Sequence, residues 1–253
     1  MEVLALVSLA GGMGRTTTAL HVALALSAYG RVLVVDLDPQ ASCTAWLGGG
    51  LAVTEPSGLE VLNGTVAVHR ALRNLGRNLW LLPADRALGL QADQLPPYDQ
   101  ELLLQHKLRL LAGEFAYCVV DTMAGKSLLT VMACCAAQWL VIPVEMSPKG
   151  VLALGDTLAF LDELQGHSLP VGKVLGILPV RDQWIGRRRI KLGVEVLKTM
   201  SSKTQNHFFT PVRETLRLKQ FGPETTLLEG TLGGPFLEVV QALHAEQTGG
   251  QDR

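Results

Sequence analysis

The feature that most constrains this chain is a glycine-rich loop that joins an apolar strand to an apolar helix near the N-terminus. Residues 1–9 are mostly apolar, and so are residues 18–28. Three glycines in such a place let backbone N–H groups converge on an anion, and the helix N-terminus adds about half a positive charge. We therefore predict that this loop binds a nucleotide phosphate and that the Thr16 hydroxyl binds magnesium. The loop residues are Ala10, Gly11, Gly12, Met13, Gly14, Arg15, Thr16 and Thr17.

Apolar runs rich in valine, isoleucine and leucine alternate with helix-length stretches along the rest of the chain. This alternation is typical of an α/β fold in which a mostly parallel, twisted sheet carries helices on both faces. About seven strands are expected, at residues 3–9, 32–36, 79–83, 117–121, 139–144, 174–179 and 207–210. Helices are expected at residues 16–29, 100–112, 127–137, 150–164 and 184–200.

Length and composition favour one folded unit. A chain of 253 residues that is 48% hydrophobic can bury one large core, and α/β folds of this size are often one domain. We expect that domain to span residues 1–246, with a frayed tail at 247–253. No apolar run reaches the ~18 residues that a membrane span needs. The apolar N-terminus lacks the basic residues of a secretion signal, so a buried first strand is expected there.

Four cysteines lack the spacing of a metal site or of a disulfide framework. No CxxC pair occurs, and no histidine cluster lies at ligand spacing. Free thiols of a cytosolic protein are therefore expected. The cysteines are Cys43, Cys118, Cys134 and Cys135.

Carboxylates follow two of the predicted strands. Asp36 and Asp38 stand in VLVVDLDPQAS, and Asp121 stands in YCVVDTMAG. With GGMGRTTTALHVALAL, these segments resemble the ParA/MinD/Soj family of deviant Walker-box ATPases. The similarity continues through WLVIPVEMSPKGVLAL and, more loosely, FTPVRETLRLKQFG, so that it covers nearly the whole chain. It implies a single-domain P-loop NTPase-like fold that binds ATP and Mg²⁺ at the glycine-rich loop.

The resemblance also implies roles for single residues. Thr16 and Asp121 would hold magnesium. Asp38 would orient the attacking water, while Asp36 would support the same segment and Pro211 would lie near the adenine. A capped turn at the end of a strand is the alternative for the two aspartates of DLDPQ, because aspartate and proline favour turns. That alternative leaves two carboxylates beside a phosphate loop without a cation to offset their repulsion.

Two positions depart from the family pattern. The family has a signature lysine, which reaches the partner subunit's nucleotide, where this chain has Ala10. Its second lysine, which bridges the β- and γ-phosphates, is replaced by Arg15. Arginine keeps the charge and can bind phosphate bidentately, but its planar group is bulkier and not interchangeable with an ammonium at a tight site. Because phosphoryl transfer depends on positioning, we expect slow hydrolysis or none.

Two other lysines are candidates to replace the missing signature lysine. Lys149 and Lys126 both follow strand ends, on the side where open α/β sheets bind ligands. The carboxysome-positioning branch of the family also lacks the signature lysine, and it is thought to supply one from the later half of the chain. We favour Lys149 over Lys126, and a solvated residue at a helix start is the alternative for each.

Basic residues are concentrated late in the chain. Residues 173–219 carry 11 Lys or Arg against 3 Asp or Glu, a net charge of +8, whereas the net charge is −5 over residues 1–172 and −4 over 220–253. Such a segment could bind DNA phosphates without reading bases. A solvated helix face is the alternative. The candidate DNA-binding residues are Arg187, Arg188, Arg189, Lys191, Arg213, Arg217 and Lys219.

The resemblance implies an ATP-dependent positioning or partitioning ATPase, cytoplasmic and associated with the nucleoid. It would dimerise on ATP, bind double-stranded DNA nonspecifically, and respond to a ParB-like or McdB-like adaptor. The cargo could be a plasmid, a chromosome or an organelle such as a carboxysome. An ATP-binding regulatory protein that has lost hydrolysis is the main alternative. A metabolic P-loop enzyme is disfavoured by the paired DLDPQ and DTMAG segments, and a membrane-binding MinD-like protein is disfavoured because residues 234–247 contain no Lys or Arg.

Overall fold

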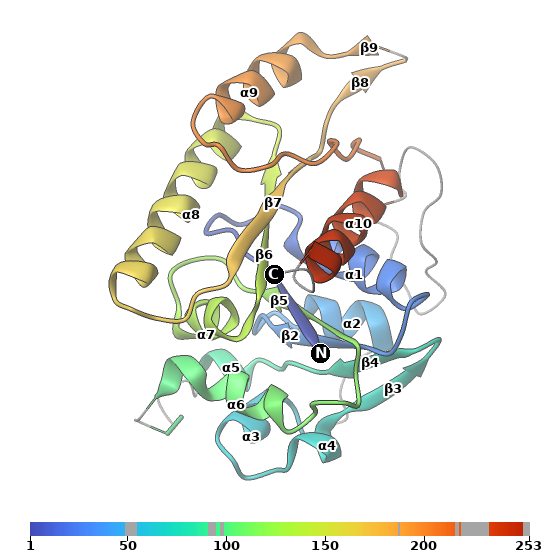
Figure 1. Ribbon diagram of the computed structural model, residues 1–253, viewed down its shortest axis with the longest axis vertical. Helices are drawn as coiled ribbons and strands as arrows, with labels where there is room; N and C mark the ends of the chain where they lie inside the picture. Colours follow the sequence, from blue (N-terminus) through green and yellow to red (C-terminus); the bar gives the residue numbers. More distant parts are fainter. Residues whose placement is uncertain are drawn as a thin grey trace.

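Seven strands form one sheet at the centre of the molecule, with the order β3-β4-β2-β5-β1-β6-β7 (Figure 1). The structure is a computed structural model that describes residues 1–48, 55–90, 95–96, 99–186, 188–215, 218 and 233–249. All neighbouring strands are parallel except β3 and β4, which are antiparallel. The prediction of a mostly parallel sheet of about seven strands is confirmed. The strands are β1 (Glu2–Leu6), β2 (Val32–Leu37), β3 (Arg73–Gly76), β4 (Leu79–Leu82), β5 (Tyr117–Thr122), β6 (Trp139–Glu145) and β7 (Lys173–Val180).

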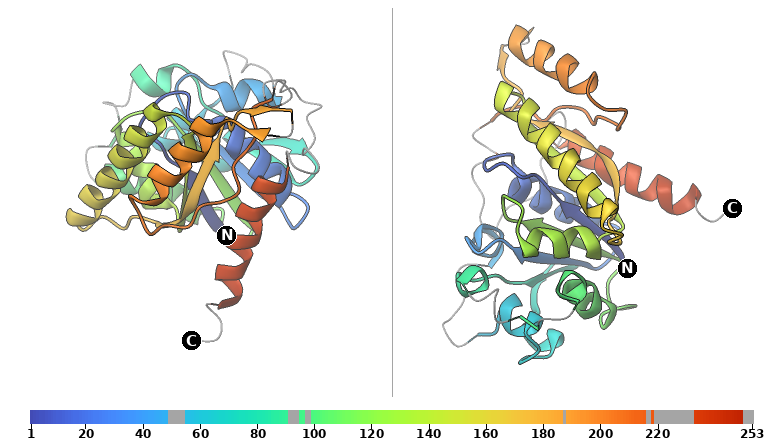
Figure 2. Two further views of the ribbon diagram at one scale, coloured as in Figure 1. Left: turned by 90° about the horizontal axis from the view of Figure 1, so that it is seen from above. Right: turned by 90° about the vertical axis from the view of Figure 1, so that its left-hand side faces the viewer.

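Helices cover both faces of the sheet (Figures 1 and 2). Within the described residues, no helix is both long and apolar enough to cross a membrane. The helices are α1 (Arg15–Leu26), α2 (Ser42–Gly48), α3 (Gly58–Leu62), α4 (Val68–Ala71), α5 (Ala87–Leu90), α6 (Leu103–Arg109), α7 (Leu128–Ala136), α8 (Pro148–Gly166), α9 (Lys191–Ser201) and α10 (Gly234–Gly249), with a 3₁₀ turn η2 (Gln100–Leu102) before α6.

The sheet separates two hydrophobic cores, and strand β1 contributes to both. Its Leu4 and Leu6 side chains are buried with residues of α1 and α10, whereas Val3 and Ala5 are buried with residues of α7 and α8. This alternation follows from the two-residue period of a strand. It also explains why the strands read as continuous apolar runs, because both faces exclude water.

The segment expected to be a helix at residues 184–200 is a helix only in its later part. Strands β8 (Trp184–Ile185) and β9 (Arg188–Arg189) pair antiparallel as a hairpin, and α9 follows. Gly186 in the turn has φ +59°, which an L-residue rarely adopts. The helical prediction was wrong here because a tertiary contact to a buried carboxylate, described below, fixes the hairpin.

The strand predicted at residues 207–210 does not form. The segment lies beside β7 and makes one parallel bridge, in which the Ile177 N–H donates to the His207 carbonyl at 2.8 Å and the Phe209 N–H donates to the Ile177 carbonyl at 2.9 Å. The ladder stops because the next two N–H groups that it needs would belong to Pro179 and Pro211, and proline has no N–H to donate. The Thr210 N–H, on the side away from the ladder, donates to the Glu238 carboxylate of α10 at 2.8 Å. The seventh strand is β3, which the sequence pattern did not predict.

Helix α10 ends the described part of the chain and packs firmly against α1. Phe236, Val239, Val240 and Leu243 are each no more than 1% exposed. Their apolar face is therefore part of the core. The helix runs through residue 249, three residues past the predicted domain end at 246, and residues 250–253 lie outside the described part.

Candidate nucleotide site and basic cluster

The glycine-rich loop leads from β1 into α1 at the carboxyl end of the sheet. Gly12 and Gly14 both have φ +81°, and Gly14 is the N-cap residue of α1, with no side-chain hydrogen bond to the helix start. The first N–H groups of α1 thus lack a capping side chain, an arrangement that suits an anion. Met13 is 1% exposed, and its sulfur accepts the Glu145 main-chain N–H at 3.4 Å, which fastens the loop to β6.

The Arg15 guanidinium lies beneath this loop and is bound to main-chain carbonyls. Its Nε donates to Thr122 O at 2.8 Å, and one Nη donates to Ser8 O at 2.5 Å and to Ala10 O at 2.7 Å. The residue is only 8% exposed. Burial lowers the pKa of Arg15, and the nearby carboxylates of Asp121 and Asp38 oppose that shift. Arg15 therefore ties the loop to the ends of β1 and β5, and its predicted contact with phosphate stays a prediction.

The carboxylates predicted from the second and fifth strands lie side by side. Asp36 and Asp121 are register partners on β2 and β5, and both are fully buried. The Asp36 carboxylate accepts the N–H and the hydroxyl of Thr44, each at 2.8 Å, and the Asp38 N–H at 3.0 Å. Asp38 is partly exposed, and its carboxylate accepts the Gln40 N–H at 2.9 Å. Asp36 is thus a structural partner of α2, and Asp38 is the more accessible carboxylate.

Asp121 fits the role of a cation ligand. Within the described residues, neither of its buried oxygens has a partner of good hydrogen-bond geometry. Burial raises the pKa of Asp121 well above its ordinary value, Asp36 raises it further, and the Thr16 hydroxyl and Arg15 act in the opposite direction. Burial likewise raises the pKa of Asp36 to about 6. A buried carboxylate without a partner is costly, and Mg²⁺ with its preference for oxygen ligands would remove that cost.

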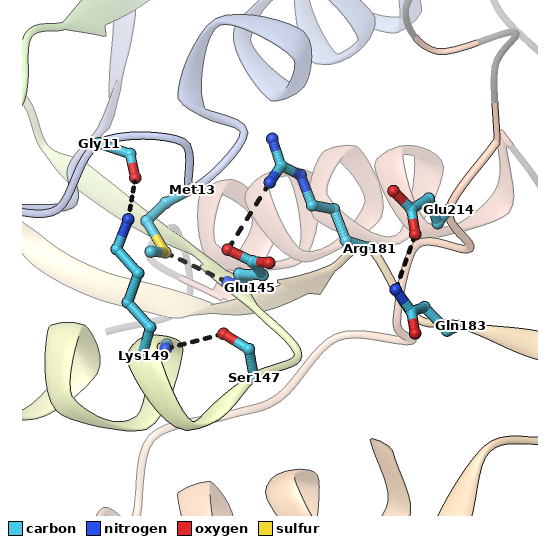
Figure 3. A network of polar contacts seen from close by, with 9 residues as sticks. Gly11, Met13, Glu145, Ser147, Lys149, Arg181, Gln183 and Glu214 are labelled. Carbon is cyan, nitrogen blue, oxygen red and sulfur yellow. Dashed lines mark hydrogen bonds and ion pairs between the residues drawn. The ribbon is translucent and has the colours of Figure 1, made fainter. Parts of the chain in front are cut away.

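Lys149 and Lys126 differ in their surroundings. Lys149 follows the N-cap Ser147 of α8, and its Nζ donates to the Gly11 carbonyl at 3.0 Å (Figure 3). A Cβ at Gly150 would lie 1.9 Å from the Glu145 carbonyl oxygen, so only glycine lets α8 start this close to the end of β6. By contrast, Lys126 forms an ion pair with Glu163 at 2.5 Å. Of these two lysines, Lys149 is the one that is hydrogen-bonded to the phosphate loop.

A pocket beside the loop has the lining of a nucleotide-base site. It is lined by threonines of α1, by apolar side chains of β7 and α10, and by the segment after Pro211, although Pro211 itself is not among the described lining residues. Charged side chains of Arg181, Arg213 and Glu214 also border it. Aromatic and aliphatic linings with a few polar groups are typical of such sites. Lining residues include Gly14, Thr17, Thr18, Val180, Val212 and Phe236.

Arg181 faces the loop from the end of β7, and the sequence pattern did not single it out. It shares a second hollow with Gly12–Thr17 loop residues, Asp38 and Trp46. Its φ of +57° is a left-handed conformation that costs an L-residue roughly 1–2 kcal/mol. Its position just after the predicted strand 174–179 was the available signal, because ligands bind at the carboxyl ends of parallel strands.

The basic residues gather around one buried carboxylate. Asp182 is 1% exposed and accepts the Trp184 Nε1–H at 2.6 Å and the Arg189 Nε–H at 2.8 Å. Arg213 lies over the Trp184 ring, with its guanidinium carbon 4.7 Å from the ring centroid, and donates to the Gly186 carbonyl at 3.2 Å. We call Arg188, Arg189, Lys191 and Arg213 the basic cluster. Three further candidates, Arg187, Arg217 and Lys219, lie outside the described residues.

Comparison with known proteins gives consistent matches over most of the chain. The AAA domain family matches residues 1–170. The chain is 39% identical to "Maintenance of carboxysome distribution protein A" of Synechococcus elongatus, over 81% of this chain and 82% of that protein. It is 26% identical to the sporulation initiation inhibitor protein Soj of Bacillus subtilis, over 87% of each chain.

Solved structures show the same relationship. The ATP complex of Cyanothece McdA(D38A) superposes with a TM-score of 0.91 at 31% identity, covering 96% of each chain. Cobyrinic acid a,c-diamide synthase of Mycobacterium smegmatis, solved with ADP and magnesium, superposes with a TM-score of 0.83 at 27% identity, covering 98% of this chain and 96% of that chain. The same enzyme is also solved with an ATP analogue and magnesium.

Proposed function

Because this chain belongs to the ParA/MinD-like family of ATPases, as an McdA-type member, we propose that it is an ATP-driven switch that dimerises and binds DNA in order to position a cargo. Its relatives include positioning and partitioning ATPases, and the McdA structure is an ATP complex. A solved synthase of the same fold holds ADP with magnesium, which is consistent with the use of ATP and Mg²⁺. The name of the Synechococcus relative supports a carboxysome as the cargo. A ParB-like or McdB-like adaptor, implied by the family resemblance, would be the stimulating partner.

One observation carries the proposal: the buried Asp121 carboxylate, which has no partner of good hydrogen-bond geometry within the described residues, lies at the strand end beside a glycine loop whose helix start has no side-chain cap. Thr16 and Asp121 would hold Mg²⁺, and the ion would neutralise charge that develops on the phosphates. The loop N–H groups would bind the phosphate chain. Asp38, partly exposed and held by the Gln40 N–H, would orient the attacking water.

Dimerisation would depend on Lys149. Its ammonium lies on the surface of the loop, where it donates to the neutral carbonyl of Gly11. A partner subunit that offers a nucleotide phosphate at this place would give the ammonium a charged acceptor in place of a neutral one. Lys149 would then replace the signature lysine that is missing at Ala10.

DNA binding would use the basic cluster and its neighbours. The cluster combines exposed Arg188 and Lys191 with a hairpin held rigid by Asp182. Two copies of the cluster, brought together by dimerisation, would double the number of neutralised phosphates. Each neutralised phosphate makes the slope of log affinity against log salt steeper by ~0.9. Association with the nucleoid follows from this DNA binding.

Light scattering tests the switch directly. The molar mass should double with ATP and Mg²⁺ but stay at the monomer value with ADP or without nucleotide. With DNA added, only the ATP form should bind, and binding should weaken at the higher of two salt concentrations. An unchanged mass with ATP, or DNA binding equal in all three states, would contradict the proposal.

A second candidate, an ATP-binding regulator without turnover, is favoured by one observation. The Nε and one Nη of Arg15 are bound to three main-chain carbonyls, so this guanidinium has less freedom to follow the phosphates than the family's catalytic lysine. Single-turnover hydrolysis with and without DNA separates the two. Slow hydrolysis that DNA stimulates supports a positioning cycle, whereas complete absence of phosphate release supports the regulator.

A further inference from the structure

Two arginines flank the phosphate loop, and they are held in opposite ways. Arg15 lies beneath the loop, with its guanidinium buried and bound to the carbonyls of three residues. Arg181 lies above it, with a side chain that is 44% exposed and a long ion pair, 3.7 Å, to Glu145. Figure 3 shows the Arg181 side chain reaching from the end of β7 toward Glu145, with Met13 on the other side of that carboxylate.

The Arg181 guanidinium is close to the loop backbone. Both of its terminal nitrogens lie 4.0 Å from the place that a Cβ would take on Gly12. It lines the same hollow as the loop residues and the Asp38 carboxylate, and it also borders the pocket beside α10. It is therefore a cation that stands between the loop and the base pocket, where the phosphate chain of a nucleotide would run.

We propose that Arg181 binds the phosphate chain of the nucleotide and supplies the mobile positive charge that Arg15, tied to the main chain, does not. This inference rests on ATP binding at the loop. The Glu145 carboxylate pairs with Arg181 in the structure, and a phosphate would compete with that carboxylate for the guanidinium. A planar guanidinium can bind two phosphate oxygens at once, which suits a residue that must grip a chain of phosphates.

If Arg15 holds the loop and Arg181 binds phosphate, their substitutions should differ in their effects on melting temperature and on ATP affinity. Arg15→Met removes hydrogen bonds that hold the loop, so it lowers the melting temperature of the chain without nucleotide. Arg181→Met removes a half-exposed side chain whose ion pair is long, so it leaves that temperature nearly unchanged. It should lower the affinity for Mg²⁺·ATP by about 10- to 100-fold, as expected for the removal of charge-assisted hydrogen bonds.

The test is equilibrium binding of ATP, ADP and adenosine, measured by calorimetry on the full chain. Arg77→Met is the matched control, because Arg77 is also an exposed arginine with a left-handed φ, of +51°, but stands between β3 and β4. The loss of affinity in Arg181→Met should be largest for ATP, smaller for ADP and absent for adenosine, and Arg77→Met should bind like the unchanged chain. An equal loss for adenosine, or unchanged ATP affinity, would overturn the inference.

Two further variants distinguish the role of the Arg181 guanidinium from effects of its left-handed backbone and of its ion-pair partner Glu145. Arg181→Gly adopts the left-handed conformation without strain, so normal ATP affinity in this variant would contradict a role for the guanidinium. Glu145→Gln should raise ATP affinity several-fold, and the gain should shrink when Arg181→Met is also present. A gain of the same size in both backgrounds would show that Glu145 acts on ATP without Arg181.

ATP binding by the unchanged chain and by Arg181→Met shows whether the proposed function or only the role of Arg181 is wrong. If the unchanged chain takes up no Mg²⁺·ATP, the proposed function fails and the inference with it. If the unchanged chain binds ATP and Arg181→Met binds it equally well, only the inference fails.

Discussion

The phosphate edge and the basic cluster hold their charges in contrasting ways. We use the term phosphate edge for the loop 10–17 together with Asp36, Asp38 and Asp121. At this edge the charged groups Arg15, Asp36 and Asp121 are nearly or fully buried, and the first two are bound largely by main-chain atoms. In the basic cluster Arg188 and Lys191 are exposed, and Arg189 and Arg213 are partly exposed around the buried anchor Asp182. From this contrast we expect ligand binding at the phosphate edge to be coupled to folding, and we expect the exposed charges of the basic cluster to be replaceable without loss of the fold.

The largest expected effect at the phosphate edge comes from removal of the Asp121 carboxylate. Asp121→Asn should reduce Mg²⁺-dependent ATP affinity by about 100-fold or more, because it removes a proposed Mg²⁺ ligand, and at metal sites even supporting groups matter 10- to 100-fold. Calorimetry with and without Mg²⁺ measures this loss. The matched control is Asp162→Asn on the exposed face of α8, which should bind normally. Retained metal dependence in Asp121→Asn would remove Asp121 from the site.

The same variant should be more stable than the unchanged chain when metal and nucleotide are absent. Because burial raises the pKa of Asp121 in the folded state, its contribution to stability is full at low pH and is lost as the pH rises. Asp121→Asn carries no such loss, so its advantage in melting temperature should grow with pH. An advantage that shrinks as the pH rises would contradict the assigned environment.

The two lysines near the loop provide the next test. Lys149→Ala should weaken ATP-dependent dimerisation by about 30-fold or more, the scale expected when one partner of a buried charged pair is removed from an interface. Lys126→Ala should leave it almost unchanged, because Lys126 is engaged by Glu163. Sedimentation at several protein concentrations in ATP gives both values. Equal effects of the two substitutions would contradict the choice of Lys149.

The anchor of the basic cluster should behave differently from the charges around it. Asp182→Asn weakens the acceptor of Trp184 and Arg189, so it should lower the free energy of unfolding by about 1–3 kcal/mol and DNA affinity by about tenfold. ATP affinity should not change. Glu195→Gln, which removes an exposed acidic charge from α9, is the control and should leave unfolding unaffected. Filter binding and urea unfolding measure the two effects, and normal stability in Asp182→Asn would refute the anchor role.

The smallest predicted effect concerns one surface charge. Arg188→Ala should leave folding and ATP binding intact and reduce the salt slope of DNA binding by ~0.9 for each phosphate that it no longer neutralises. Arg109→Ala, on α6 at the opposite end of the molecule, should leave the slope unchanged (Figure 1). If both changes alter the slope equally, the positive charge acts through net charge and not through a cluster.

The phosphate edge was predictable because a short motif determines its geometry locally. Glycines with positive φ between a strand and a helix, and aspartates that end neighbouring parallel strands, fix where Thr16, Asp36 and Asp121 stand. The basic cluster was not predictable in the same way. The run of arginines after Trp184 fits a helix or a hairpin equally well, and the buried Asp182 that decides between them acts through tertiary contacts.

The sequence also does not predict the tertiary contacts of single side chains. The loop sequence predicts a cation at Arg15 but does not reveal that nearby carbonyls would bind its guanidinium. Arg181 belongs to no sequence motif. Its position beside the loop depends on a left-handed backbone conformation at the end of β7, which brings its guanidinium close to Gly12. The strand predicted at 207–210 failed for a comparable reason, because only its pairing with β7 brings Pro179 and Pro211, which have no N–H, to the next positions of the ladder.

The most direct test of the proposed switch compares DNA affinity in Mg²⁺·ATP and Mg²⁺·ADP at one salt concentration, for the unchanged chain and for Asp121→Asn. We predict tight DNA binding by the unchanged chain in ATP alone and weak binding by Asp121→Asn in both nucleotides. Equal DNA affinity of the unchanged chain in ATP and ADP would contradict the claim that the phosphate edge controls the basic cluster.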